Sequence, residues 1–369
     1  MAVAKAAIES GVARKPITDW DEYKNRLLEL MGQENKLTRQ LYDTARHAPQ
    51  RVVFAEGAHP NMLKAAVEAR SEGLCHPILL GNREVIAKLA KEADLSLEGI
   101  EIVNLREDKE ADRRERYARL FSEKRAREGV NYPEANDKMF DRNYFGMMMV
   151  ETGEADAFIT GLYTKYSHTI KVATEVVGIQ PGYKHFGTMH ILNSKKGTFF
   201  IADTLINRHP DADTLTDIAK LSAKAVRFFN QEPVIAMLSY SNFGSDKVGS
   251  PSKVHEAVAS LQAEFPDLAI DGEMQVKFAL DQELRDRMYP FTRLKGKDVN
   301  TLVFPNLSSA NATYQLIQSM SETEVIGPIQ MGLNKPIHFT DIESSVRDIV
   351  NITAIACIDA IVEKKIKKG

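Results

Sequence analysis

Short apolar runs alternate with longer amphipathic stretches from residue 51 towards the end of the chain. Each run holds three to five residues and passes directly into small or polar residues, as Val234 to Leu238 passes into Ser239. This alternation is typical of parallel strands whose two faces are both covered by helices. The runs lie at residues 52–54, 77–80, 157–159, 199–202, 234–238 and 302–304. The pattern therefore predicts an α/β fold, with a ligand crevice at the carboxyl ends of the strands.

The first 48 residues follow a helical pattern instead. Asp19 and Glu22 form a candidate capping box, and the apolar residues after it recur at helical spacing. Those residues are Tyr23, Leu27, Leu30 and Met31. A second helical stretch carries Leu37, Leu41 and Tyr42. Because segments of this length are too short to bury a core of their own, we predict linker helices ahead of a domain.

Residues 105–128 are dense in Arg, Glu, Asp and Lys. Tyr117, Leu120 and Phe121 stand among these charges at helical spacing. A charge run of this kind predicts an amphipathic helix that faces solvent over most of its surface.

Composition narrows the class of protein further. With 48 basic and 51 acidic residues the formal net charge is -3, which indicates no basic face for nucleic acid. Cys75 and Cys357 are the only cysteines, too few for the disulfide framework of a small secreted protein. No apolar stretch approaches the roughly 18–20 residues of a membrane helix, and the N-terminus lacks a secretory signal. We therefore expect a cytoplasmic protein that binds neither nucleic acid nor membrane.

The loop after the apolar run 234–238 is the richest candidate for ligand binding. It reads Ser239-Tyr240-Ser241-Asn242-Phe243-Gly244-Ser245, and Ser250-Pro251 then indicates the N-cap and first position of a helix that ends near Glu264. Hydroxyls, small residues and a helix N-terminus together suit an anion. Gly244 and Gly249 have the spacing of a P-loop, but the lysine that such a loop requires is absent. A structured turn without a ligand is the alternative interpretation.

Several common sites have no support in the sequence. No G-x-G-x-x-G motif occurs, and neither H-E-x-x-H nor G-x-S-x-G is present. His185 and His190 are five residues apart and do not share a helical face, so we expect core or surface histidines rather than metal ligands. We predict no metal site and no cofactor in this chain.

Five segments, in this order, resemble the phosphotransacetylase family. The first, residues 239–245, resembles the family's S-Y-S-T-K-G-S, and the second, residues 271–275, resembles D-G-E-L-Q. The others are residues 304–307 with Asn311 and Tyr314, residues 327–329 with Gly332, Lys335 and Pro336, and Ser345 with residues 348–351. One such match is weak evidence, but five in register across residues 50–362 are strong.

The resemblance implies a two-domain α/β subunit of the isocitrate dehydrogenase-like kind. One α/β/α subdomain would take residues 49–178 and 333–369, and the other residues 179–332. Both sheets would be mostly parallel, with a cleft between the subdomains. Family members are dimers, so a homo-oligomer is expected.

The first residues of the chain resemble a second class of protein. Residues 2–16, with Glu9-Ser10-Gly11-Val12-Ala13 inside them, resemble the end of the catalytic region of bacterial NADP-dependent malic enzymes. In that class a phosphotransacetylase-like domain follows the dehydrogenase. The resemblance implies that residues 1–48 are the end of that region plus linker helices. NADP and a divalent metal would then belong to an upstream domain of the same polypeptide.

Phosphotransacetylases use an aspartate as base and arginines to hold phosphate. The resemblance places Arg125 at one arginine position, Lys171 at a second and Ile342 at a third, while Asp348 keeps the aspartate. Isoleucine cannot donate a hydrogen bond, and removing one such donor typically costs on the order of 10²–10³ in rate. Asp341 and Glu343 add negative charge where a phosphate would sit. The aspartate has two open interpretations, a relic base or a helix cap.

The predicted site follows from these positions. Its catalytic residues are Asp348, Arg125 and Lys171, with impaired activity. Its ligand-binding residues are Ser239, Tyr240, Ser241, Gly244, Ser245, Asn311, Gln330 and Lys335.

Three functions remain open. The leading hypothesis is a regulatory and oligomerisation domain of a malic enzyme that senses acetyl-CoA, a related acyl-CoA or acyl phosphate. The second is an active phosphate acetyltransferase, and the third is a purely architectural oligomerisation domain.

Overall fold

The computed structural model describes residues 36–163, 165–194, 196–321 and 323–366, together with Ala4, Ile8, Ile17 and Tyr23. The predicted capping box and the apolar positions Leu27, Leu30 and Met31 lie outside these residues. The second predicted stretch is confirmed as helix α3 (Lys36–His47), in which Leu37 and Leu41 are buried.

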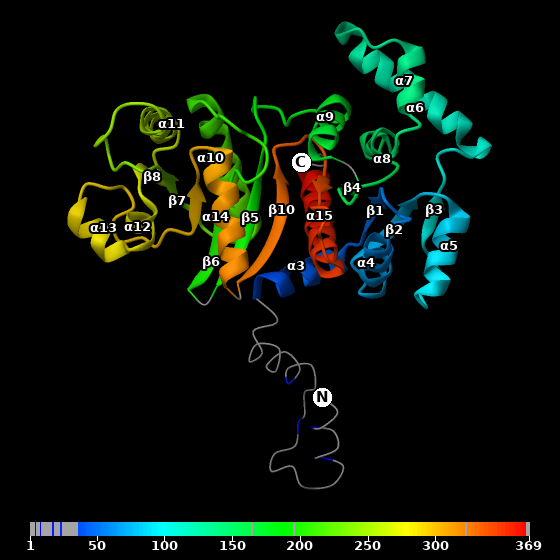
Figure 1. Cartoon of the computed structure of the whole chain (residues 1–369), viewed down its shortest axis with the longest axis horizontal. Coiled ribbons are helices and arrows are strands. Elements are labelled where there is room, and N and C mark those ends of the chain that lie inside the picture. Colours follow the sequence, from blue (N-terminus) through cyan, green and yellow to red (C-terminus); the bar gives the residue numbers. More distant parts are fainter. Residues whose placement is uncertain are drawn as a thin grey trace.

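The chain folds into two lobes that lie side by side, each built on one sheet (Figure 1). In the first lobe all strands are parallel and have the order β11-β4-β1-β2-β3. The strands are β1 (Gln50–Phe54), β2 (Cys75–Leu80), β3 (Glu101–Val103), β4 (Ala157–Thr160) and β11 (Ile337–Phe339). The remaining helices of this lobe are α4 (Pro60–Ser71), α5 (Arg83–Glu92), α6 (Ala111–Arg125), α7 (Tyr132–Lys138), α8 (Arg142–Glu151), α9 (Tyr166–Val176) and α15 (Val346–Ile366).

The sheet of the second lobe has the order β10-β5-β6-β9-β7-β8. Strand β5 runs antiparallel to both of its neighbours, and the other pairs are parallel. The strands are β5 (Gly187–Ser194), β6 (Gly197–Ala202), β7 (Val234–Leu238), β8 (Ala269–Met274), β9 (Thr301–Val303) and β10 (Glu324–Met331). The helices are α10 (Ala212–Phe228), α11 (Ser250–Glu264), α12 (Val276–Leu280), α13 (Gln282–Met288) and α14 (Leu307–Met320).

The predicted α/β fold with mostly parallel sheets is therefore confirmed. Each predicted apolar run falls in a strand, although Phe304 lies one residue past the end of β9. The runs are apolar throughout because both faces of each sheet are covered. On β1, Val52 and Phe54 pack in one core cluster with residues of α4 and α15, whereas Val53 packs in another with residues of α6 and α8. Where one lobe passes into the other along the chain stays a prediction.

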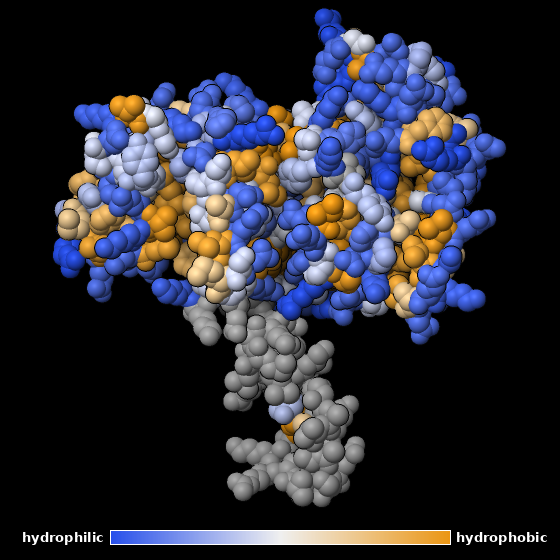
Figure 2. Space-filling view, viewed as in Figure 1, coloured by the Kyte–Doolittle hydropathy of each residue, from blue (hydrophilic) through white to orange (hydrophobic). Residues whose placement is uncertain are grey.

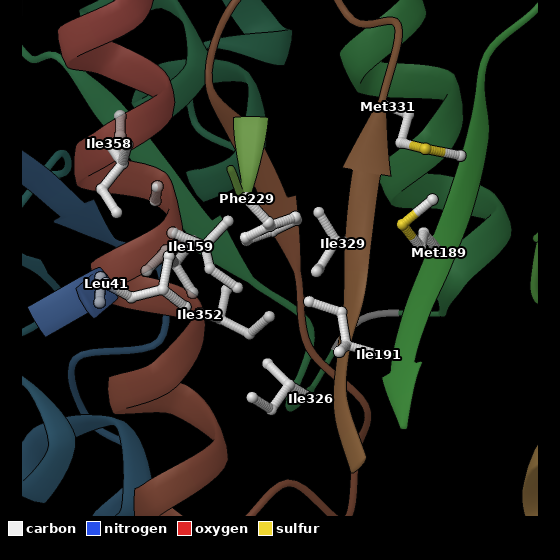
Figure 3. Packing of buried hydrophobic residues seen from close by; sticks show 14 of the residues in the cluster. Leu41, Ile159, Met189, Ile191, Phe229, Ile326, Ile329, Met331, Ile352 and Ile358 are labelled. Atoms are coloured by element: carbon white, nitrogen blue, oxygen red, sulfur yellow. The ribbon is translucent and has the colours of Figure 1, made fainter. Parts of the chain in front are cut away.

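One core cluster joins the lobes. It continues from α4 and α15 in the first lobe to α10, β5 and β10 in the second. Figure 3 shows Ile352 and Ile358 of α15 facing the space in which Ile326 and Ile329 of β10 also lie. Helix α15 also contacts α3 and α4. The long C-terminal helix is thus a structural element shared by both lobes.

The charged stretch forms helix α6, which projects with α7 from the first lobe (Figure 1). Its Tyr117 and Phe121 are buried as expected, but Leu120 is 43% exposed, so the apolar stripe is narrower than predicted. The surface around α6 and α7 is mostly hydrophilic (Figure 2). Over the described residues, no helix has both the length and the apolar character needed to cross a membrane.

Candidate functional site

The connection from β11 to α15 lies at the carboxyl edge of the first sheet. The Thr340 N–H donates to the Thr160 carbonyl over 2.8 Å, which continues the pairing of β11 with β4. Gly161 follows β4 with a φ of +143°, and a Cβ there would lie 2.1 Å from the Thr340 carbonyl oxygen. The two loops therefore pack backbone to backbone, which fixes the position of residues 340–345.

Asp348 caps the N-terminus of helix α15. Its Oδ2 accepts hydrogen bonds from the Ser345 N–H at 2.9 Å and from the Ser345 hydroxyl at 2.7 Å. The Asp348 N–H in turn donates to the Ser345 hydroxyl at 3.3 Å. This reciprocal pattern is a capping box. The geometry gives physical support to the capping interpretation, and a role of Asp348 as a base stays a prediction.

The segment just before this cap is acidic and carries no cation. Ile342, which stands where the resemblance expects an arginine, is 70% exposed. Burial, together with the nearby charges of Asp348 and Glu343, raises the pKa of Asp341. Three carboxyl groups thus share the end of α15, and a phosphate dianion placed here would meet negative charge.

Arg125 binds the C-terminus of helix α9. Its guanidinium donates to the carbonyl of Glu175 at 2.5 Å and to that of Thr174 at 2.7 Å, and it also contacts Glu128. A cation at a helix C-terminus is stabilised by the helix dipole and by the last carbonyls. These contacts use three of the five guanidinium N–H groups and hold the side chain against the end of α9.

Lys171 is more accessible. It lies on α9, its side chain is 67% exposed, and its Nζ is 3.7 Å from the Glu175 carboxylate. Because an ion pair at that distance and exposure is weak, Lys171 remains free to meet an anion.

A buried polar wall lies in the second lobe beside β10. The ring of His190 stacks on Tyr314 with a centroid distance of 4.1 Å, and its Nδ1 is 2.8 Å from the Thr204 hydroxyl. Burial lowers the pKa of His190 to about 3, so the ring is uncharged at neutral pH. Gly327 makes this packing feasible, since a Cβ there would lie 2.6 Å from the His190 ring.

Two predicted ligand-binding residues belong to this wall. The Asn311 side chain donates to the Thr204 carbonyl at 3.3 Å. The Gln330 side chain donates to the Tyr166 hydroxyl of the first lobe at 2.9 Å, so it bridges the two lobes. Asp341 acts electrostatically on both Tyr166 and Tyr314, which places the acidic segment near the same wall.

The loop after β7 is closed by its own hydrogen bonds. Glu273 is fully buried, and one of its carboxylate oxygens accepts from the Gly244 N–H at 2.5 Å. Ser241 and Ser245 pair through their hydroxyls at 2.8 Å, and the Tyr240 hydroxyl donates to Asp246. A carboxylate therefore already occupies a donor that an anion would use. Ser239, at the base of the loop, donates its N–H to the Met274 carbonyl.

The loop is also distant from the buried polar wall. Strands β5, β6 and β9 separate β7 from β10. At about 4.8 Å per strand the loop lies roughly 19 Å from β10 and roughly 10 Å from Thr204, the part of the wall that follows β6. Helix α11 begins one residue earlier than predicted, with Gly249 as its N-cap and Ser250 as its first residue. Lys335, another predicted ligand residue, pairs with Glu363 at 3.0 Å.

Sequence reasoning missed the network that holds the wall in place. Asp203, directly after β6, accepts from the Thr188 hydroxyl at 2.6 Å and from the Asn207 N–H at 2.7 Å. A signal for it existed, because Asp203 and Thr204 follow an apolar run and parallel strands present their ends to the crevice. No comparable signal marks Tyr166 or His338. Within the described ranges, no group of three or more His, Cys, Asp or Glu side chains is arranged to hold a metal ion.

Known proteins similar to this chain include malic enzymes and phosphate acetyltransferases. The family model described as phosphate acetyl/butaryl transferase matches residues 36–357. The NADP-dependent malic enzyme of Escherichia coli (strain K12) is 38% identical over 364 residues, which is 97% of this chain and 47% of the relative. The phosphate acetyltransferase of Synechocystis sp. is 33% identical over 320 residues, 86% of this chain and 45% of that protein.

The fold is shared with solved phosphotransacetylases. The crystal structure of a phosphotransacetylase from Streptococcus pyogenes superposes with a TM-score of 0.80 at 31% identity, covering 88% of this chain and 99% of that one. In contrast, the chain spans about half the length of the curated relatives it matches.

Proposed function

The chain belongs to the phosphate acetyl/butaryl transferase family, and we propose that it serves as the acyl-ligand-sensing part of a longer NADP-dependent malic enzyme. In this proposal the cleft between the lobes binds acetyl-CoA, a related acyl-CoA or an acyl phosphate. Transfer of the acyl group to phosphate is slow or absent.

The observation that carries the proposal is the exposed Ile342 between Asp341 and Glu343. Transfer to phosphate requires a cationic donor that stabilises the developing charge, and this position offers an apolar side chain with a carboxylate on either side. Two of the remaining family groups have other partners, since Arg125 binds two backbone carbonyls and Asp348 binds Ser345, whereas Lys171 stays accessible to an anion. Binding of an acyl ligand does not require this cationic donor, whereas transfer to phosphate does. The uncharged wall around Gln330 and Tyr314 can hold a thioester or an amide.

The similarity to malic enzymes over about half of their length supports the wider proposal. The malic enzyme active site, with its NADP and divalent metal, would lie in another part of the polypeptide, in the cytoplasm. The subunits would assemble at least as dimers. Occupancy of the cleft regulates malate decarboxylation only if the ligand binds one state of the assembly better than another.

The test has two steps on the purified chain. The first measures acetyl-CoA formation from acetyl phosphate and CoA beside an active phosphotransacetylase, and we expect a rate at least about 100-fold below that control. A rate near the control would make the chain an active transferase and would overturn the proposal.

The second step measures acetyl-CoA binding by isothermal titration calorimetry. Saturable binding in the absence of turnover is the expected result. Absence of both binding and turnover would leave the architectural role and would reject the sensor.

A further inference from the structure

A large cavity lies between helices α10 and α15, on the side of β10 where the core joins the lobes. Its volume is about 690 Å³, which is within the usual range for small-molecule sites. Strand β10 and the start of β11 contribute Ile329, Met331 and His338 to its lining. Asp341, Tyr166 and Tyr314 do not line it, whereas Gln330 does, so the cavity adjoins the buried polar wall described above.

The walls of the cavity are apolar and come from both lobes. Leu221 and Phe228 of α10 line one side, and Ile355, Ile358 and Val362 of α15 line the other. In Figure 3, Phe229 lies between Ile358 of α15 and Ile329 of β10. Walls of this kind suit an alkyl chain, because they remove apolar surface from water.

The surroundings of His338 indicate that the ligand carries a group that donates a hydrogen bond. Its side chain is 1% exposed, and its Nε2 is 3.3 Å from Asp359 Oδ2. Because the Asp359 carboxylate accepts, this contact places a proton on Nε2, and in the tautomer with that proton Nδ1 is an acceptor. Among the described residues Nδ1 has no hydrogen-bond partner. A buried acceptor without a partner is unfavourable, so a ligand that donates an N–H here gains affinity.

Gln330 adds a second acceptor of the same kind. It also lines the cavity, is 7% exposed, and uses its amide nitrogen to bind Tyr166. Its Oε1 has no partner in the described part of the chain. Both unpaired atoms are acceptors, which favours a ligand with N–H donors over one with only carbonyl or carboxylate oxygens.

The charges that line the cavity favour an anion. Lys224, Arg227 and Lys335 are the cations, and Asp359 and Glu363 are the acids. Both acids already have partners, because Asp359 contacts His338 and Glu363 contacts Lys335 at 3.0 Å. Among the described residues Lys224 contacts the neutral side chain of Gln180, at 2.8 Å, and no acid. The uncompensated charge lies on α10.

We propose that this cavity binds an anionic amphiphile that consists of an acyl chain, an amide N–H and a terminal acidic group. The chain lies between α10 and α15, the amide N–H donates to His338 Nδ1, and the acidic group lies near Lys224. Because the walls come from both lobes, the bound ligand holds the lobes in one relative position. This second site shares Gln330 with the buried polar wall and otherwise has a different lining from the cleft invoked for acyl-CoA.

Two probes that differ by one group test the hydrogen bond. N-decanoylglycine carries the chain, the N–H and the carboxylate, whereas N-decanoylsarcosine has a methyl group in place of the N–H. Calorimetric titration of the full chain, below the micellar concentration of either probe, measures both dissociation constants. We expect N-decanoylglycine to bind about tenfold more tightly, the effect of one buried hydrogen bond. Equal affinities, or no binding of either probe, would overturn the proposal.

A matched pair of charge variants on one helix tests the location. Lys224→Glu reverses a charge at the cavity, and Lys220→Glu reverses one a turn earlier that pairs with Glu264 and does not line the cavity. Both residues lie near the surface, so both variants are expected to fold. Lys224→Glu should weaken N-decanoylglycine binding by about 3- to 10-fold and Lys220→Glu by less than about twofold. Equal effects of the two changes would refute the assignment.

A third measurement excludes a macromolecular occupant. Sedimentation of the chain with and without saturating N-decanoylglycine should show the same subunit number. Loss of an oligomer on binding would mean that a second copy of the chain covers the cavity, and the small-molecule proposal would be wrong.

Discussion

Replacing Asp348 separates the two interpretations of this residue. Its Oδ2 accepts two hydrogen bonds from Ser345 at the start of α15. Losing a side-chain cap costs about 0.5–2 kcal/mol, and losing the favourable charge at a helix N-terminus costs about 0.3–1 kcal/mol. We therefore expect Asp348→Ala to lower the free energy of unfolding by about 1–3 kcal/mol, and Asp348→Asn by less because the amide oxygen still accepts.

The first turn of α15 cannot fray without cost. Ile349 and Val350 are fully buried immediately after the cap. Removing the cap should therefore lower the free energy of global unfolding rather than only fray the end of the helix. Urea denaturation followed by circular dichroism measures this free energy. Ser345→Ala serves as the matched control, since it removes the other half of the capping box. The double variant should lose less than the sum of the two single variants, because both changes remove the same interaction.

The same variants are assayed for acetyl-CoA formation from acetyl phosphate and CoA. If Asp348 acts as a base and not as a cap, Asp348→Asn will abolish a turnover that the unmodified chain shows, and Asp348→Ala will leave the free energy of unfolding within about 0.3 kcal/mol. That combination would refute the capping interpretation. A loss of stability with no change in an already low rate would support it.

Further predictions concern the buried wall and the two altered family positions. His190→Gln should make stability depend less on pH. Between about pH 6.5 and pH 3 the unfolded chain binds a proton at His190, whereas the folded chain does not. The free energy of unfolding of the unmodified chain therefore falls by up to about 1.4 kcal/mol per pH unit as the pH drops. Urea titrations at pH 4 to 7 measure this, with the exposed His76→Gln as control. Ile342→Arg should raise any residual acetyl transfer, since the side chain is 70% exposed and has room for a guanidinium; an unchanged rate would count against the alignment there. Lys171→Ala should weaken acetyl-CoA binding by about 3- to 10-fold in calorimetry, and an unaltered affinity would show that the ligand does not use this cleft.

The apolar pattern predicts strands whose residues are apolar on both faces, and it misses strands with buried polar groups. Strand β8 carries Asp271 and Glu273, which interrupt any apolar run. The Asp271 carboxylate is buried because it accepts from the Thr292 hydroxyl at 2.7 Å and from the Arg293 N–H at 2.9 Å. These partners come from a distant loop. Spacing along one strand therefore cannot reveal that these charges are compensated.

The candidate site was harder to predict for a related reason. The order of motifs identifies the family, but a residue type does not reveal which donors are already occupied. Arg125 is an arginine where the family expects one, yet its guanidinium binds the last carbonyls of α9. Gly244 lies in a loop that suits an anion, yet its N–H meets the buried Glu273. Both partners are remote in sequence, and only the fold brings them into contact.

Helix α15 gives the two proposed sites a common mechanical element. Its N-terminal turn is fixed by Asp348 beside the acidic segment, and its C-terminal half lines the cavity through Ile355, Ile358 and Val362. A helix of 21 residues is about 31 Å long and, packed on both lobes, moves as one body. A ligand that fills the cavity must either fit the present position of α15 or shift it. A shift would move the segment around Asp341, because that segment is joined directly to the first turn. Coupling between the sites therefore requires no separate pathway, only two positions of one helix that the two ligands bind differently.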